Sequence, residues 1–322
     1  MNQKINCIDL GYKKLKYINS EGASGIFDSE IAPYIKHPME ESLKGVVEII
    51  TVDGKREKHL YGETALRESN VSGFTRDRDK HHHPAHNVLM FAASRKMDAK
   101  PGDVLVVGVP ISYRGQKDEL KMHLERLHAN VSVDGGEEGR VSFGKVIVLT
   151  QGIVVFSIIP DLPEGLLISI DGGQKTTDVS TVEHKKGKLT PVPSKCFSLE
   201  IGYHQVVEQV RDIFQSETGT PITAVKAREL AENGNIRFMG KNIKLVEKIN
   251  KVKENVASAK IEEVKNRLGD SLQFAAGVYL LGGCAEVLPL NKLIPGSKVV
   301  EDPQMANARA YLEVAKKIIK SA

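Results

Sequence analysis

The feature that most constrains this chain is a pattern that occurs twice. An apolar strand carrying an aspartate runs through a glycine-containing turn into a second strand, once around Asp9 and once around Asp171. Each copy is followed by segments with helical spacing. Because 322 residues are enough for two ordinary domains, the repetition predicts two domains of related α/β architecture.

The periodicity of the first half predicts alternating strands and helices. We expect strands at 4–18 (with a turn inside), 103–109 and 141–149, and helices at 84–96 and 113–128. In the second half a strand at 166–170 leads into a polar turn and another strand. Helices are predicted at 201–217, 222–233 and 303–320, and helical spacing also runs through 241–268. A strand is predicted at 277–281.

The stretch 241–268 is rich in Lys and Glu. Leu245, Ile249, Val252 and Val256 form an apolar stripe along it, and we expect its charges to form a solvated face.

Composition and charge narrow the class of protein. Apolar residues make up 41% and charged residues 27% of the chain, which is typical of a globular protein. The formal net charge of +4 comes from Lys and Arg interleaved with Asp and Glu, so nucleic acid is not required as a partner. No apolar run approaches the roughly 18 residues of a membrane span, and the polar start lacks the pattern of a secretion signal. We therefore expect a cytoplasmic protein whose cysteines, Cys7, Cys196 and Cys284, are buried thiols.

The first candidate phosphate-binding motif is Ile8-Asp9-Leu10-Gly11 with Lys16 farther along. Glycine permits a tight turn, the Lys16 ammonium can contact a phosphate, and Asp9 can hold a hydrated Mg²⁺. A strand followed by Asp-Leu-Gly also occurs in purely structural hairpins, so the motif alone does not decide.

Two further motifs lie in the second half. The polar turn at 171–178, Asp-Gly-Gly-Gln-Lys-Thr-Thr-Asp, has more small and hydroxyl-bearing residues than a plain hairpin needs, which favours phosphate binding. Gly282 and Gly283 follow a buried strand and let the backbone approach a flat ligand, although they also suit a simple turn.

Other site types are disfavoured. The chain contains neither G-x-x-x-x-G-K-S/T nor G-x-G-x-x-G, which argues against P-loop and Rossmann nucleotide sites. His81, His82, His83 and His86 can in principle bind a metal, but a histidine run in a polar loop is usually solvated, and we assign no metal there.

In this order the motifs resemble those of the actin, sugar kinase and chaperone ATPase superfamily, and within it the ParM-like bacterial actin homologues of plasmid segregation. The resemblance covers nearly the whole chain. Asp9, Gly11 and Lys16 match the first phosphate motif, Gln151 the first connecting motif, 171–178 the second phosphate motif, and Gly282 with Gly283 the adenosine motif. The segment 302–310 resembles the second connecting helix and favours the ParM-like branch.

The resemblance implies a duplicated, ribonuclease H-like α/β fold with a nucleotide cleft between the domains. Domain I would be 1–150, completed by the C-terminal helix 303–322, and domain II would be 151–302. The implied cofactors are Mg²⁺ and ATP, with GTP as the alternative. Asp9 and Asp171 would act in catalysis and hold the metal through water, while Gln151 would orient the attacking water.

The resemblance also implies a set of nucleotide-binding residues: Gly11, Tyr12, Lys13, Lys16, Gly172, Gly173, Gln174, Lys175, Thr176, Gly202, Arg228, Glu229, Gly282, Gly283 and Cys284. The chain departs from actin at three of them. Tyr12 and Lys13 replace smaller residues in the first turn, and Lys175 replaces a glycine in the second, so phosphate contacts there are expected to differ.

The implied function is an ATPase that forms helical filaments and segregates plasmid DNA. Its partners would be further copies of itself and a DNA-binding adaptor at a centromere-like site, without direct contact to nucleic acid or membrane; the terminal KKIIKSA is too short for an amphipathic anchor. Two alternatives stay open, a small-molecule kinase of the same superfamily and a cytoskeletal actin homologue outside plasmid segregation.

Overall fold

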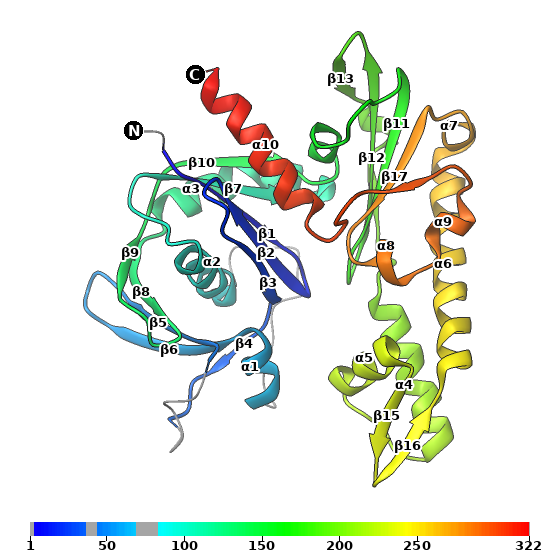
Figure 1. Cartoon of the computed structure of the whole chain (residues 1–322), viewed down its shortest axis with the longest axis horizontal. Coiled ribbons are helices and arrows are strands. Elements are labelled where there is room, and N and C mark those ends of the chain that lie inside the picture. The colour runs from blue at the N-terminus through cyan, green and yellow to red at the C-terminus, as the bar shows by residue number, and fades with distance from the viewer. Residues whose placement is uncertain (1–2, 37–43, 69–82, 322) are drawn as a thin grey trace. The chain divides into compact units, whose positions relative to one another are not determined.

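The computed structural model describes residues 3–36, 44–68 and 83–321 (Figure 1). The chain divides into two compact units, and each is described by itself. Unit 1 is Met1–Ile158 together with Asn307–Ala322, and unit 2 is Ile159–Ala306.

Unit 1 is built on a five-stranded mixed sheet of order β10-β7-β1-β2-β3. β1 runs parallel to β7, and β7 to β10, whereas β1, β2 and β3 follow one another as antiparallel neighbours. The strands are β1 (Ile5–Leu10), β2 (Lys14–Asn19), β3 (Ser24–Asp28), β7 (Asp103–Val109) and β10 (Phe143–Thr150). The strand predictions in this half are confirmed, with small shifts at the ends.

Alternating side chains of the central strands cover both faces of this sheet. On one face Cys7 and Val106 pack against Tyr311 of α10 (Ala306–Lys320). On the other face Ile8 and Leu105 belong to the core that includes α2 (Pro84–Lys96). Burial on both faces fixes the register of β1, because a slip by one residue would exchange the two sets.

A second sheet in unit 1 has the order β4-β6-β5-β8-β9, and α2 contacts strands of both sheets. Its strands are β4 (Ile31–Pro33), β5 (Val46–Ile50), β6 (Arg56–Tyr61), β8 (Ala129–Val133) and β9 (Gly139–Val141). The remaining helices of unit 1 are α1 (Gly62–Glu68), η3 (Ile111–Gln116), α3 (Lys117–Arg126) and η4 (Val154–Ser157).

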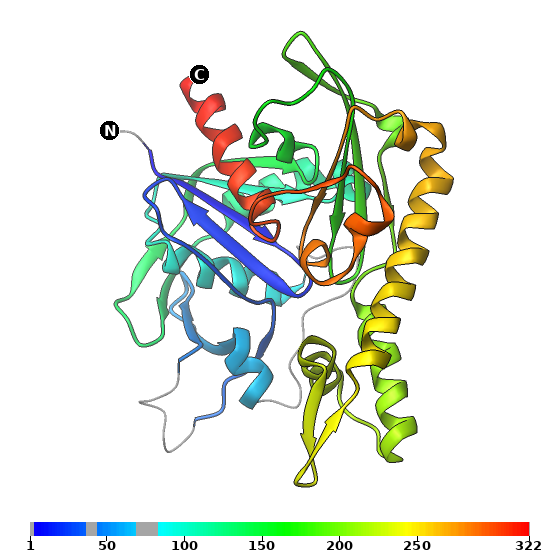
Figure 2. The ribbon, with the colours of Figure 1, turned by 45° about the vertical axis from the view of Figure 1, so that its right-hand side comes forward.

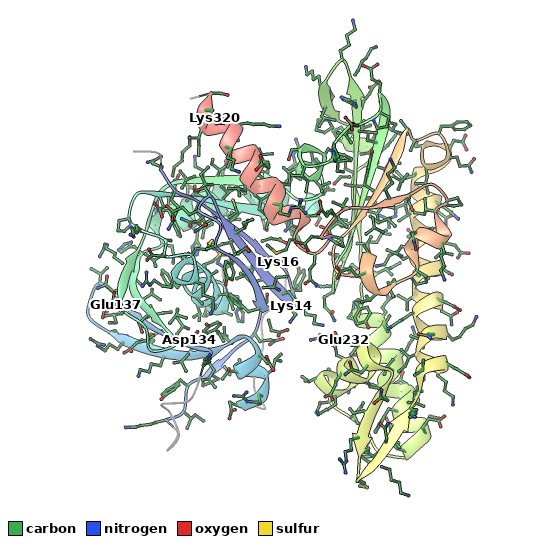
Figure 3. All side chains as sticks on the ribbon, in the orientation of Figure 1. Lys14, Lys16, Asp134, Glu137, Glu232 and Lys320 are labelled. Carbon is green, nitrogen blue, oxygen red and sulfur yellow. The ribbon has the colours of Figure 1, made fainter. Side chains whose placement is uncertain are left out.

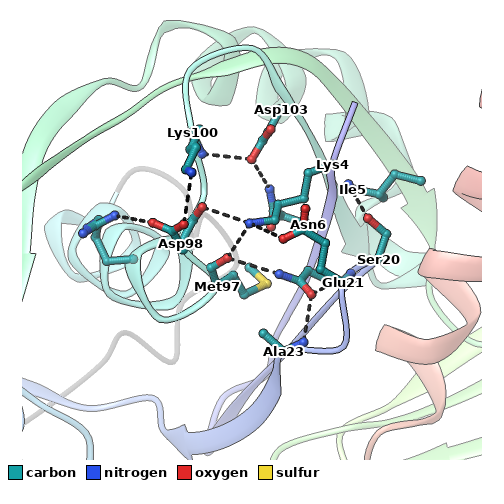
Figure 4. Close-up of polar contacts among 12 residues, drawn as sticks. Lys4, Ile5, Asn6, Ser20, Glu21, Ala23, Met97, Asp98, Lys100 and Asp103 are labelled. Carbon is teal, nitrogen blue, oxygen red and sulfur yellow. Dashed lines mark hydrogen bonds and ion pairs between the residues drawn. The ribbon is translucent and has the colours of Figure 1, made fainter. Parts of the chain in front are cut away.

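Polar side chains hold the amino ends of β1 and β7 to the segment that follows α2 (Figure 4). The Lys4 ammonium donates to the carbonyls of Met97 and Asp98, both at 3.1 Å. The Asn6 amide donates to the Asp103 carboxylate at 3.1 Å. These groups stabilise the fold at the amino ends of the strands. Ligands of open α/β sheets bind at the carboxyl ends of the strands, so a binding site is expected at the opposite edge of this sheet.

Unit 2 repeats the mixed sheet of unit 1 that contains β1 and β7. Its order is β13-β12-β11-β17-β18, with β14 also paired to β12, so an antiparallel hairpin again adjoins parallel strands. The strands are β11 (Gly165–Gly172), β12 (Thr177–Lys185), β13 (Lys188–Pro191), β14 (Phe197–Leu199), β17 (Gly277–Leu281) and β18 (Lys298–Val299). The duplication predicted from the two aspartate hairpins is confirmed.

Helices cover one face of this sheet, with α6 packed beside α4 (Figures 1 and 2). The helices of unit 2 are α4 (His204–Thr218), α5 (Ala224–Asn233), α6 (Val246–Leu268), α7 (Asp270–Gln273), α8 (Cys284–Val287) and α9 (Leu290–Leu293), with the short turn η5 (Pro193–Lys195). β15 (Asn235–Phe238) and β16 (Lys241–Lys244) form a separate hairpin.

Two expectations for the stretch 241–268 are wrong. Its first residues form β16, because the Met239–Gly240 turn reverses the chain with both residues at positive φ. Its charges are not all solvated, because Lys260 lies on the buried stripe between Val256 and Val264 and is 0% exposed.

The cysteines are free thiols, but Cys196 is only half-buried, contrary to expectation. Burial raises the pKa of Cys7 far above its usual value, so this thiol stays protonated. No helix in the described part of the chain is long and apolar enough to span a membrane.

Candidate nucleotide-binding site

In unit 1 the site begins with Asp9, which is 3% exposed near the carboxyl end of β1. The β1–β2 register sets Asp9 opposite Lys16, and the Lys16 ammonium lies 3.0 Å from one Asp9 carboxylate oxygen. Figure 3 labels Lys16 on this hairpin. The other Asp9 oxygen accepts a hydrogen bond from the Gln151 side-chain amide at 2.8 Å. The structure therefore brings together three residues that the sequence predicted for one site.

Gln151 reaches Asp9 because it directly follows β10. β1, β7 and β10 are parallel, so their carboxyl ends meet at one edge of the sheet, where such folds bind ligands. The Gln151 main-chain N–H donates to the Val109 carbonyl at 2.9 Å, which fixes the start of the loop.

Asn307 of α10 holds this loop, and Tyr311 of α10 packs beside Gly108 of β7. The Asn307 side chain accepts a buried hydrogen bond from the Gly152 N–H at 3.1 Å. A side chain on Gly108 in β7 would overlap Tyr311 and would lie 3.0 Å from the Gln151 side chain, so glycine is needed there.

The turn of the first hairpin is closed by a hydrogen bond from the Gly11 N–H to the Lys14 carbonyl at 3.1 Å. A Cβ on Gly11 would lie 2.8 Å from that carbonyl oxygen, which explains the glycine. Tyr12 and Lys13 occupy the turn and are half-buried. The Lys14 ammonium is paired with Asp28 at 3.0 Å.

The second hairpin has the same construction at the carboxyl end of β11. In the β11–β12 register Asp171 lies opposite Asp178. The Gly173 N–H donates to the Thr176 carbonyl at 2.9 Å, which closes the turn around Gln174 and Lys175. The turn residues are half-buried, so their backbone groups lie near the surface of unit 2.

Helix α4 begins against this turn. The Tyr203 N–H donates to the Gly173 carbonyl at 3.1 Å, and the His204 N–H donates to the Gln174 carbonyl at 2.9 Å. A side chain on Gly202 would overlap the Gln174 carbonyl oxygen. The predicted residue Gly202 is thus required for the helix to approach the hairpin.

The Gly282–Gly283 turn follows β17, which lies beside β11 with Leu281 opposite Asp171. Gly282 has φ +76°, and a side chain there would overlap the Asp171 carboxylate, so only glycine suits this position. Gly283 has helical dihedrals. The Cys284 thiol then donates to the Gly173 carbonyl at 3.3 Å and ties this turn to the second hairpin.

The two predicted residues of α5 differ in their surroundings. Glu229 pairs with Lys226 at 2.7 Å on an exposed surface. Arg228 lies close enough to Tyr203 to lower the pKa of its hydroxyl, although burial and the nearby Glu232 and Cys284 raise that pKa overall. Figure 3 labels Glu232 near the end of α5.

We assign no metal-binding role to the histidine run at 81–86. His81 and His82 lie outside the described residues, and His83 accepts a hydrogen bond from the Ala85 N–H at the start of α2. Among the residues that the structure describes, no group of three or more His, Cys, Asp or Glu is arranged to hold a metal ion.

Two family models together match most of the chain. Residues 7–153 match "Actin like proteins N terminal domain", and residues 169–292 match "Archaeal actin homologue MreB-like, C-terminal". A search of curated protein sequences found no match.

Solved structures agree with both matches. A 15-stranded ParM filament from Clostridium botulinum is 22% identical with a TM-score of 0.88, over 98% of this chain and 100% of that one. A non-polymerisable quadruple mutant of pCBH ParM is 23% identical with a TM-score of 0.86 over the same shares. The archaeal actin homolog Ta0583 in complex with ADP is 23% identical with a TM-score of 0.82, over 97% of this chain and 99% of that one.

The chain is an actin homologue with a ParM-like fold.

The Asp9 carboxylate in the first hairpin of this actin homologue keeps acceptor sites that a hydrated metal could use. A carboxylate has about four lone-pair sites, and Lys16 and Gln151 use one on each oxygen of Asp9. The remaining acceptor sites can bind water. Mg²⁺ gives up its waters reluctantly, so contact through water fits this arrangement.

Sequence reasoning missed three residues of the actin homologue that support the site: Asn307, Tyr311 and Gly108. Asn307 lies in the segment 302–310 whose resemblance was noticed, and Tyr311 directly follows it, but the groups that both residues contact are far away in the chain. Gly108 interrupts the valine-rich run of β7, and a glycine inside a strand indicates close approach by another group.

Proposed function

We propose that this actin homologue binds ATP with Mg²⁺, hydrolyses the terminal phosphate, and assembles into filaments that segregate plasmid DNA. The observation that carries the proposal is the Asp9 carboxylate, buried and held between Lys16 and Gln151. A purely structural hairpin has no need of a glutamine that arrives from a strand end 142 residues away.

The residues of the first hairpin would act on the reacting phosphate. Phosphoryl transfer depends mainly on positioning and charge stabilisation. Because the Gln151 amide nitrogen donates to Asp9, its oxygen points away from Asp9 and can accept a hydrogen bond from the attacking water. Lys16 supplies positive charge, and Mg²⁺ held through water by Asp9 and Asp171 would neutralise charge on the phosphates.

The residues of unit 2 would bind the rest of the nucleotide. The second hairpin offers backbone N–H groups in the turn from Gly173 to Thr176 for phosphate oxygens. Gly283 would let the base approach the backbone, and Arg228 would contact the ribose. The ADP complex of the archaeal relative supports nucleotide binding by this fold.

Assembly and DNA segregation are proposed from the relatives. The filament described for the Clostridium botulinum ParM supports self-association. Head-to-tail contacts that do not close produce helical filaments of this kind. The formal net charge of +4 is mild, which agrees with DNA contact through an adaptor protein and not by this chain.

Electron microscopy and light scattering of the pure protein test the proposal, with phosphate release followed in the same samples. ATP and Mg²⁺ are expected to produce filaments and phosphate, whereas ADP, or ATP with the Mg²⁺ chelated, is expected to produce far fewer. Parallel samples with GTP establish the preferred base.

The outcomes separate the alternatives. No binding at millimolar nucleotide would overturn the proposal. A small oligomer that consumes ATP only when a small acceptor molecule is added would indicate a kinase of the same superfamily. Filaments that form without any phosphate release would indicate a non-hydrolysing structural homologue.

A further inference from the structure

A lysine that the proposed mechanism does not use is buried beneath the second hairpin. Lys260 lies on α6, and its neighbours at the spacing of one helical turn are Val256 and Val264. Its side chain is fully buried, at 0% exposure, where the stripe otherwise carries aliphatic residues. Such a position normally excludes a charge, because an ammonium group loses its hydration when it is buried.

The Lys260 ammonium lies against the hairpin. A Cβ on Gly172 would be 3.4 Å from the Lys260 nitrogen and would also meet the side chain of Cys284. Gly172 is the last residue of β11, immediately before the turn. Lys260 thus brings a positive charge to the base of the phosphate-binding turn.

The protein groups nearby do not neutralise this charge. Within the described residues the Lys260 ammonium has no hydrogen-bond partner. The Gly173 carbonyl, the next oxygen along the hairpin, already accepts from the Tyr203 N–H and from the Cys284 thiol.

A second buried donor belongs to Tyr203, whose main-chain N–H bonds to the turn. The Tyr203 hydroxyl also has no hydrogen-bond partner among the described side chains and backbone groups, and the residue is 6% exposed. Cys284 is among the groups that raise the pKa of this hydroxyl, so Tyr203 and Lys260 both lie near Cys284. Lys260 and Tyr203 are therefore two buried donors near Cys284 that no described group satisfies, and buried polar groups of this kind are rare in folded proteins.

We infer that Lys260 is an electrostatic determinant of nucleotide affinity, whose buried charge stabilises the polyphosphate bound by the second hairpin. The inference rests on the proposed function, because it requires a nucleotide at this hairpin. Lys260 acts through the turn and does not replace its N–H groups. The N–H groups at the start of α4 already donate to carbonyls of the hairpin, so they are less available to an anion than the N–H groups of a free helix start. In the inferred role, the Lys260 ammonium supplies the positive charge that this helix start does not.

The test is Lys260→Met, which keeps the length and removes the charge. Dissociation constants are measured by calorimetry for ATP, ADP, AMP and adenosine, and melting temperatures are measured without ligand. The control is Lys251→Met on the same helix, because the Lys251 side chain is 72% exposed and its removal makes the same change in net charge.

Lys260→Met is expected to weaken ATP and ADP binding on the order of tenfold, AMP less, and adenosine little. The loss should persist at raised salt, because buried charges are screened less than exposed ones. The unliganded melting temperature should stay level or rise, since an unpaired buried charge is removed. Lys251→Met should match the wild type throughout.

Unchanged affinity for ATP in Lys260→Met would overturn the inference, and so would an equal loss for adenosine, which would assign Lys260 to the nucleoside. A lower melting temperature with wild-type affinities would make the residue structural. Failure of the wild-type protein to bind any nucleotide would instead contradict the proposed function itself.

Discussion

At the scale of single residues, adjacent glycines of this actin homologue serve different purposes. Gly282 has φ +76°, and a side chain would overlap Asp171, so the fold itself requires glycine. Gly283 has φ −62° and ψ −24°, which any residue can adopt. The nearest obstacle to a Cβ on Gly283 is the end of the Gln304 side chain at 3.3 Å, and that side chain can move.

This difference predicts opposite effects of the same substitution. Gly283→Val should retain the fold and its melting temperature but weaken nucleotide binding, because the branched Cβ blocks approach of the base to the backbone. Gly282→Val should destabilise the fold by at least about 1–3 kcal/mol, because valine does not tolerate positive φ. Calorimetric binding and thermal melting of both variants check this; wild-type affinity in Gly283→Val would make that turn merely structural.

The residues of the candidate site differ in how far the sequence could predict them. Asp9 and Lys16 are seven positions apart on one hairpin, so their pairing follows from the hairpin register. Gln151 reaches Asp9 only through the order of three parallel strands, and local periodicity does not encode that order. The resemblance to a known family supplied this step. Lys260 was missed because the charges of this Lys- and Glu-rich stretch were expected to form a solvated face.

At the scale of elements, local chemistry decided which predictions held. The bounds of α2 match the prediction, since Pro84 starts the helix and the apolar run continues to Lys96. β7 also matches, because an apolar run ends at Pro110. The β15–β16 hairpin was missed, because Met239 turns the chain with φ +45°, a conformation that methionine rarely adopts.

Helix α10 is the element that ties the end of the chain to the Gln151 loop of unit 1. Asn307, in its first turn, accepts the hydrogen bond of the Gly152 N–H, one residue after Gln151. The bond is buried, so its loss leaves a backbone donor without its partner. The stability of the fold and the position of the Gln151 loop are therefore linked through this one side chain.

Asn307→Ala should lower the free energy of unfolding by about 1–2 kcal/mol and slow phosphate release, because the Gln151 loop loses an anchor. Lys317→Ala, an exposed change on the same helix, is the control and should alter neither quantity. Denaturant unfolding and phosphate-release assays provide the two measurements. A stability loss with a wild-type rate would show that the loop keeps its conformation without Asn307.

At the scale of the whole molecule, fold and assembly have different sequence requirements. The chain keeps the fold of its ParM relatives at 22–23% identity, because buried patterns and a few glycines specify the mixed sheet that the two units share. Subunit contacts depend on exposed side chains, which the fold does not specify. Polymerisation must therefore be tested through its dependence on the nucleotide, and Gln151 offers a way to separate assembly from hydrolysis.

Gln151→Ala should slow phosphate release on the order of 10² or more, because a group that positions the attacking water is lost. ATP affinity should change little, since the hairpins that bind the phosphates stay in place. If assembly follows ATP binding and disassembly follows hydrolysis, the variant should form filaments with ATP that persist, while wild-type filaments decay as phosphate appears. Parallel light scattering and phosphate assays measure both. Wild-type phosphate release by the variant would refute the catalytic role, and loss of ATP binding would make Gln151 a structural residue of the Asp9 hairpin.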